Sequence, residues 1–154
     1  MQRVCLAILR FCLSAWVGIA VFFVTVIIGL RQSTLFAEAT KFDHPKVLFP
    51  VYYGFELATL GTALACAGVG LWNERIGRAR RYAIAQLVIV AAALALWDYA
   101  IVYRDLLEMM NGPVPLPASF HELHRLSRRL NEAIVGAIAT AAILAIMPEK
   151  SAQS

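Results

Sequence analysis

Four long runs of apolar residues constrain the fold of this chain more than any other feature. Residues 11–30 and 133–147 contain no charged side chain, residues 47–72 contain only Glu56, and residues 82–103 contain only Asp98. A helix needs roughly 20 mostly apolar residues to cross the hydrocarbon core of a bilayer. The sequence therefore predicts an all-α integral membrane protein whose transmembrane helices span about residues 4–30, 47–72, 82–110 and 119–147.

The overall composition supports the same class. Hydrophobic residues make up 60% of the chain and charged residues 16%, whereas soluble domains average about 45–50% apolar and about 25% charged residues. Because the connections are short, we expect an antiparallel up-down four-helix bundle that forms a single membrane domain over residues 1–154. The first apolar run is longer than the roughly 7–15 residues of a signal-peptide core, so this helix should remain as an anchor.

The basic residues predict the orientation in the membrane. The connection between the second and third helices is the most basic, which places it in the cytoplasm by the positive-inside rule. Its arginines are Arg75, Arg78, Arg80 and Arg81. With four spans, both termini are then cytoplasmic, and we expect the protein in the cell (plasma or inner) membrane. The net charge of +4 is explained by this topology, and we expect no nucleic-acid partner.

Small residues recur at helical spacing on the first two predicted helices. In membranes such residues allow helices to approach closely. We therefore expect both faces to be packing surfaces, with protein on both sides of the second helix. The first face is formed by Ser14, Gly18, Thr25 and Gly29, and the second by Gly54, Ala58, Gly61, Ala65 and Gly68. Pro45 should end any helix before the second span, and Pro50 should lie in the first turn of that span.

Polar side chains within the apolar runs are the candidates for chemistry. An aspartate deep in a membrane costs roughly 2.5–3.5 kcal/mol on insertion scales, so such groups face the protein interior, pair, or mark a pathway. Because consecutive helices alternate in direction, the start of the second, the end of the third and the start of the fourth helix share one membrane side. We therefore predict one ligand-binding or proton-relay site formed by Tyr52, Glu56, Asp98, His121, His124, Ser127 and Asn131.

Three classes of function follow from this site. The first is a membrane protein that binds or passes a small solute, an ion or a proton. The second is a structural or accessory subunit, in a homo-oligomer or membrane complex, whose polar residues only pack helices. The third is a metal or redox protein with His121, Glu122 and His124 as candidate ligands. Glu122 points about 100° away from His121 on a helix, so the three side chains do not easily bind one metal ion.

Each polar group also has a structural interpretation. Glu56 should be either protonated or partnered, since burial disfavours the charged form, and Arg31, His124 and Arg128 are its expected partners. No nucleophile–base pair is recognisable, so an enzyme is unsupported, and we predict neither a metal nor a cofactor. The lipid bilayer is the one certain partner of such a chain.

Three motifs resemble a known family. "WVGIAVFF", "LFPVYYGFELATLGTAL" and "FHELHRLSRRLN" are similar to segments of the four-span membrane family of the transmembrane protein 205-like type, which also occurs in bacteria as a domain of unknown function. The resemblance implies an integral membrane protein without an established activity; a link of the eukaryotic namesake to platinum-drug tolerance hints at transport or trafficking. The matching positions are Gly18, Phe49, Pro50, Tyr52, Phe120, His121, Leu123, His124, Ser127 and Asn131.

Copper-resistance and haem-oxidase four-helix families share only the general pattern. Their first helix typically carries a histidine near its apolar start, where this chain has Phe11, Cys12 and Ser14. This difference argues against carrying haem or copper chemistry over to this protein.

Overall fold

The protein folds into long helices that follow the four apolar runs. The computed structural model describes residues 1–71, 76–112 and 116–148, apart from the side chains of residues 38, 39, 41 and 42. Within these residues the elements are α1 (Gln2–Gln32), α2 (Glu38–Gly70), α3 (Arg78–Trp97), the π-helical segment η1 (Asp98–Tyr103), α4 (Arg104–Asn111) and α5 (Ala118–Ile146), with no strand. The all-α prediction is confirmed.

Four stretches of helix are long and apolar enough to cross a membrane. They are Gln2–Gln32, Asp43–Gly70, Arg78–Asn111 and Ala118–Ile146. All four match the predicted ranges to within four residues. The third span consists of α3, η1 and α4 in one continuous helical stretch. The predicted end of the second span at Trp72, and Arg75 of the basic connection, lie outside the described residues.

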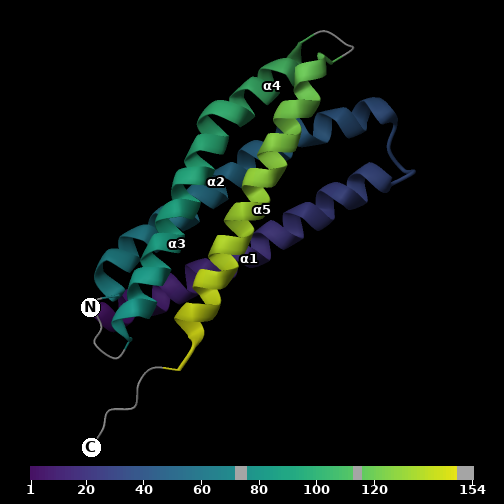
Figure 1. Ribbon diagram of the computed structural model, residues 1–154. Coiled ribbons are helices and arrows are strands. Elements are labelled where there is room, and N and C mark those ends of the chain that lie inside the picture. The colour runs from purple at the N-terminus through teal and green to yellow at the C-terminus, as the bar shows by residue number, and fades with distance from the viewer. Residues whose placement is uncertain (72–75, 113–115, 149–154) are drawn as a thin grey trace, which may run out of the picture.

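The helices pack in a closed cycle. α1 packs against α2 and α5, and α3 packs against the same two helices. The start of α1, the end of α2, the start of α3 and the end of α5 lie at one end of the molecule (Figure 1). At this end the Arg80 guanidinium donates hydrogen bonds to the carbonyl oxygens of Met147 (2.7 Å) and Pro148 (2.9 Å), and so satisfies acceptors that the end of α5 leaves free.

Alanine and branched aliphatic side chains form the main core. It runs along all four spans and consists of Leu6, Leu9, Cys12, Leu13, Trp16, Ala20, Leu60, Ala63, Ala67, Leu71, Ile76, Ile84, Val88, Ala91, Ala95, Ile134, Ile138, Ala141, Ala142 and Ala145. The alanines allow close approach of the backbones, as small residues do in membrane helix packing. Small residues therefore form the helix contacts, but they are the alanines of this core and not the small residues that the sequence indicated.

The two predicted small-residue faces lie on the outside of the chain. Ser14, Gly18, Thr25 and Gly29 of α1 are exposed, and so are Gly54, Ala58, Gly61, Ala65 and Gly68 of α2. A Cβ atom at any of these glycines would meet nothing within 4 Å. The expectation that α2 has protein on both sides is therefore wrong for this chain, because the opposite face of α2, with Leu60, Ala63 and Ala67, makes the buried contact.

Gly70 is the one glycine on the packed side of α2 among those that the structure describes. A Cβ atom there would lie 2.8 Å from the backbone nitrogen of Leu6 and 3.1 Å from the carbonyl carbon of Cys5. Backbone atoms in a helix cannot move aside as a flexible side chain can. The end of α2 and the start of α1 therefore depend on the absence of a side chain at this position.

We expect Gly70→Ala to lower the free energy of unfolding by about 1–3 kcal/mol, the usual effect of overpacking a close contact. Gly68→Ala is the matched control on the same helix, because the space around its Cβ is open. Alanine has the higher helix propensity, so the control should unfold at the same temperature as the wild type or higher. Thermal unfolding in detergent micelles checks both, and equal behaviour of the two variants would contradict the close contact.

Two features of the helices differ from the sequence prediction. α2 begins at Glu38 and continues through Pro45 and Pro50, both of which lie inside the helix. The prediction that Pro45 ends a helix is wrong: a proline removes only its own N–H, and membrane helices tolerate this loss. The third span is also not uniform, because its π-helical segment starts at Asp98, one of the two carboxylates in the apolar runs.

Candidate functional site

Asp98 lies at the centre of a buried hydrogen-bond network. Its Oδ2 atom accepts hydrogen bonds from the Tyr53 hydroxyl (2.7 Å), the Ser127 hydroxyl (3.1 Å) and the Asn131 Nδ2 (2.9 Å). The donors come from α2 and α5, whereas Asp98 is the first residue of η1. The three hydrogen bonds on one oxygen therefore hold the Asp98 carboxyl group in place and tie η1 to α2 and α5.

Asn131 extends the network to a fourth side chain. Its Oδ1 accepts a hydrogen bond from the Tyr52 hydroxyl at 3.3 Å, and its Nδ2 also donates to the backbone carbonyl of Ser127 at 3.1 Å. The amide therefore uses both its donor and its acceptor. This arrangement holds the Asn131 side chain in one orientation and ties α2 to α5 through Asp98.

Glu56 is the second carboxyl group in this part of the core. It is 1% exposed, as is Asp98, and the two interact electrostatically. Neither oxygen of Glu56, nor Oδ1 of Asp98, has a hydrogen-bond partner in the described part of the chain. Of the side chains that the structure describes, the buried polar or charged ones are Glu56, Asp98 and Ser127, so no buried cationic side chain balances the two carboxyl groups.

The space around these carboxyl groups limits what they can bind. The three unpartnered oxygens are enclosed so closely that no water-sized space adjoins them. Two buried carboxylates cannot both stay ionised at short range without a compensating charge. A proton is small enough to compensate them without any rearrangement, so in the conformation described here the pair is suited to hold a proton.

The π-helical segment places Asp98 on the buried face of its helix together with Tyr103. In a regular α-helix, residues five apart lie about 140° from each other, since each residue turns the chain by about 100°. The i→i+5 pattern of η1 instead brings positions five apart close to one face, and Asp98, Val102 and Tyr103 are all buried. Such segments occur frequently at functional sites.

Aromatic rings cover the network on the side of α1. Tyr52, Tyr53 and Tyr103 form a buried cluster with the partly buried Phe23 and Phe49. The Tyr52 ring stacks on Phe23 of α1 with centroids 4.3 Å apart, and the rings of Tyr53 and Tyr103 lie 4.6 Å apart. These rings keep water from the carboxyl groups, which strengthens the electrostatic interactions between them.

The histidines of the predicted site lie apart from the network. His121 and His124 are exposed at the start of α5, and both rings contact Phe120 with centroids 5.9 Å away. The charged groups that act on His124 are Arg31, Arg128 and His121. The expected pairing of Glu56 with Arg31, His124 or Arg128 is therefore wrong, because these residues gather at the exposed end of α1 and α5.

The structure thus brings together five of the seven residues that the sequence predicts. Tyr52, Asp98, Ser127 and Asn131 share one network and Glu56 lies beside it, whereas His121 and His124 do not join it. Sequence reasoning missed Tyr53, the donor at the shortest distance to Asp98. The available signal was its spacing, since Tyr53 and Glu56 lie three residues apart and therefore on one helix face.

Metal-binding groups are not assembled anywhere in the described part of the chain. No set of three or more His, Cys, Asp or Glu side chains there could hold a metal ion. Cys5, Cys12 and Cys66 are free cysteines.

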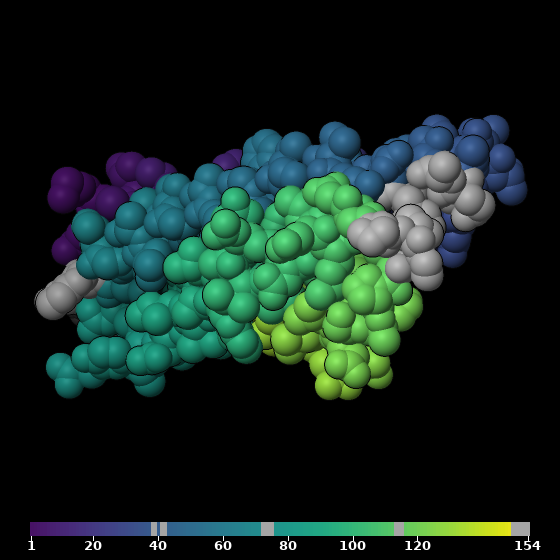
Figure 2. Space-filling view, turned by 90° about the horizontal axis from the view of Figure 1, so that it is seen from above, coloured from purple at the N-terminus to yellow at the C-terminus, as the bar shows by residue number. Residues whose placement is uncertain are grey.

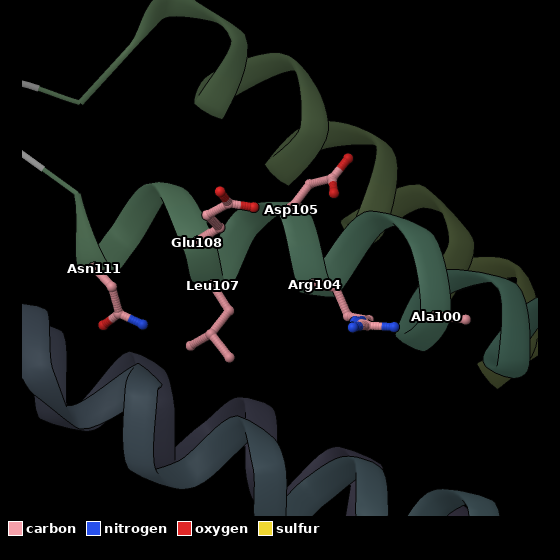
Figure 3. Close-up of a pocket in the computed structure, with 6 residues that line it drawn as sticks. All are labelled: Ala100, Arg104, Asp105, Leu107, Glu108 and Asn111. Atoms are coloured by element: carbon pink, nitrogen blue, oxygen red, sulfur yellow. The ribbon is translucent and has the colours of Figure 1, made fainter.

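A polar hollow lies farther along the same span. It has a volume of about 450 Å³ and is lined by Ala100, Arg104, Asp105, Leu107, Glu108 and Asn111 of η1 and α4. Figure 3 shows Arg104, Leu107 and Asn111 pointing to one side of α4, whereas Asp105 and Glu108 point to the other. The hollow does not include Glu56 or Asp98, so this open space and the buried carboxyl groups are separate features.

Comparisons with known proteins leave the family open. No protein-family model, no curated protein and no solved structure matches this chain. The resemblance to the transmembrane protein 205-like family therefore stays a prediction from the three sequence motifs.

Proposed function

We propose that this protein binds a proton at Glu56, which interacts electrostatically with Asp98, and passes it through the membrane. The observation that carries the proposal is the pair of buried carboxyl groups, with three unpartnered oxygens and no water-sized space beside them. A buried carboxylate in a membrane helix marks a proton or substrate pathway by default. The two carboxyl groups lie on different helices, α2 and η1, so movement between these helices would change their separation.

Glu56 and Asp98 differ in their hydrogen bonds, and we assign them different roles for that reason. Asp98 is held in place by three donors. Glu56 has no donor in the described structure, so it is the group that is free to carry the exchangeable proton. The carboxyl group of Asp98 acts electrostatically on Glu56.

The proposal includes the direction of each helix in the membrane and the side on which the termini lie. The four spans are arranged as an antiparallel up-down bundle in the cell membrane with both termini in the cytoplasm. The supporting features are the basic residues Arg78, Arg80 and Arg81 at the start of α3, on the end of the molecule where α1 also starts (Figure 1). The carboxyl pair then lies in the non-cytoplasmic half of the membrane.

Proton flux into reconstituted vesicles tests the proposal. We expect vesicles with the wild-type protein to dissipate an imposed pH gradient faster than protein-free vesicles, as measured by a pH-sensitive dye in the lumen. The double variant Glu56→Gln/Asp98→Asn keeps the shape of both side chains but cannot exchange a proton at these positions, so it should behave like protein-free vesicles. Wild-type vesicles that are no leakier than protein-free ones, at equal verified incorporation, would refute the proposal.

The hydrogen-bond network also favours a second candidate function. Asp98 joins α2, η1 and α5 through Tyr53, Ser127 and Asn131, which is what a structural or accessory membrane subunit needs. In that case the polar residues serve helix packing alone. The isosteric double variant would then assemble normally, and neither it nor the wild type would conduct protons.

A further inference from the structure

A groove between the end of α2 and the start of α3 combines apolar walls with a basic end. It has a volume of about 380 Å³, and its lining includes Leu64, Gly68, Ala85 and Ile89 on the walls and Arg78, Arg81 and Tyr82 at the basic end. Figure 2 shows, as Figure 1 does, that the end of α2 and the start of α3 lie at the same end of the molecule as the purple start of α1. The proposed proton pathway uses none of these residues.

The groove runs from the membrane surface toward the hydrocarbon core. Arg78 is the first residue of the third stretch of helix that is long and apolar enough to cross a membrane, and Ile89 lies about 16 Å farther along it, at 1.5 Å per residue. Tyr82, which is 65% exposed, stands between them at the level where amphipathic aromatic rings contact headgroups. A ligand that fills this groove is therefore polar at one end and apolar along the rest.

The basic end of the groove has hydrogen-bond donors to spare. Arg81 donates from Nη1 to the carbonyl oxygen of Leu71 at 3.3 Å, which uses one of the five N–H donors of its guanidinium. Arg78 is exposed, and neither arginine forms an ion pair within the described part of the chain. No side chain caps the start of α3, and its first turn contains no acidic residue. This end therefore attracts an anion.

We propose that the groove binds an anionic phospholipid, with one acyl chain along its apolar walls and the phosphate at Arg78 and Arg81. Basic pockets between membrane helices hold anionic headgroups, and arginine suits phosphate because its planar group can donate two hydrogen bonds at once. The complementarity of charge and shape decides the occupant. A neutral lipid or an apolar helix would leave the arginines unmatched, and a free phosphate ion would leave the apolar walls uncovered.

Native mass spectrometry of the full-length protein in neutral detergent tests both parts of the site. With phosphatidylglycerol and phosphatidylcholine of the same acyl chains, the wild type should retain phosphatidylglycerol preferentially. Arg78→Gln should weaken phosphatidylglycerol binding roughly fivefold, the contribution of one arginine near the membrane surface, and leave phosphatidylcholine binding unchanged. Gly68→Leu should weaken the binding of both lipids, because a side chain there enters open space in the groove.

Two matched variants make the same changes outside the groove. Arg3→Gln removes an exposed arginine from the start of α1, which lies at the same end of the molecule (Figure 1). Gly54→Leu adds the same side chain to the exposed face of α2, about 21 Å along the helix from Gly68, where the space around a Cβ atom is also open. Both variants should bind the two lipids as the wild type does.

Three results would overturn the lipid site. Equal losses in Arg78→Gln and Arg3→Gln would show diffuse charge attraction instead of a defined site. Unchanged lipid binding by Gly68→Leu, or displacement of phosphatidylglycerol by millimolar inorganic phosphate, would show that no acyl chain lies in the groove. A wild-type dimer that Gly68→Leu dissociates without changing lipid retention would assign the groove to a second copy of this chain.

Discussion

Vesicles that contain the Glu56→Gln variant should show no more proton flux than protein-free vesicles. Glutamine has nearly the same shape as glutamic acid but neither takes up nor releases a proton near neutral pH. Because Glu56 has no hydrogen-bond partner in the described structure, the exchange breaks no bond there. The free energy of unfolding should therefore stay within about 1 kcal/mol of the wild type, the scale of one net hydrogen bond.

An exposed carboxylate outside the network provides the control for Glu56. Glu132→Gln removes an acid of the same type that is exposed and paired with Arg128, and it should leave both flux and stability unchanged. Flux through Glu56→Gln at the wild-type rate would show that Glu56 does not carry the proton. A folded Glu56→Gln variant without flux would also separate the proton-carrying function from a role in packing alone.

Asp98→Ala should have the largest effect on stability. The variant removes the acceptor of three donors, the buried hydroxyls of Tyr53 and Ser127 and the partly buried amide of Asn131. A buried donor left without a partner costs about 1–3 kcal/mol, and the donors can partly regroup, so we expect a loss of about 2–5 kcal/mol. Unfolding in mixed detergent micelles measures this loss.

Asp98→Asn is the matched variant for this position. Its carboxamide oxygen can accept the same three hydrogen bonds, so it should lose less than half as much stability as Asp98→Ala. It also removes one of the two carboxyl groups of the proposed site, so its flux should fall even though it folds. If the Asp98→Ala and Asp98→Asn variants had equal free energies of unfolding, the network would not be the feature that holds α2, η1 and α5 together.

These predictions rest on residues from three elements that the sequence only partly indicates. Alternating helix direction places Glu56, Asp98, Ser127 and Asn131 on one membrane side, which the order of the apolar runs is enough to predict. It does not say which way each side chain turns around its helix axis. The imidazoles illustrate the difference: His121 and His124 share the predicted side but face outward, because Phe120, Leu123 and Leu130 pack on the inner side of α5.

The sequence by itself determined that this chain forms four helices long and apolar enough to cross a membrane. A bilayer admits few structures, and an uncharged run of sufficient length has to become a helix because lipid cannot satisfy free backbone groups. Only the tertiary structure decided the rotation of each helix, the π-helical segment at Asp98, the donor role of Tyr53 and the exposed position of the glycine face of α2. These depend on how side chains fit across helices, and on a membrane helix the apolar residues that face lipid and those that face protein are chemically the same.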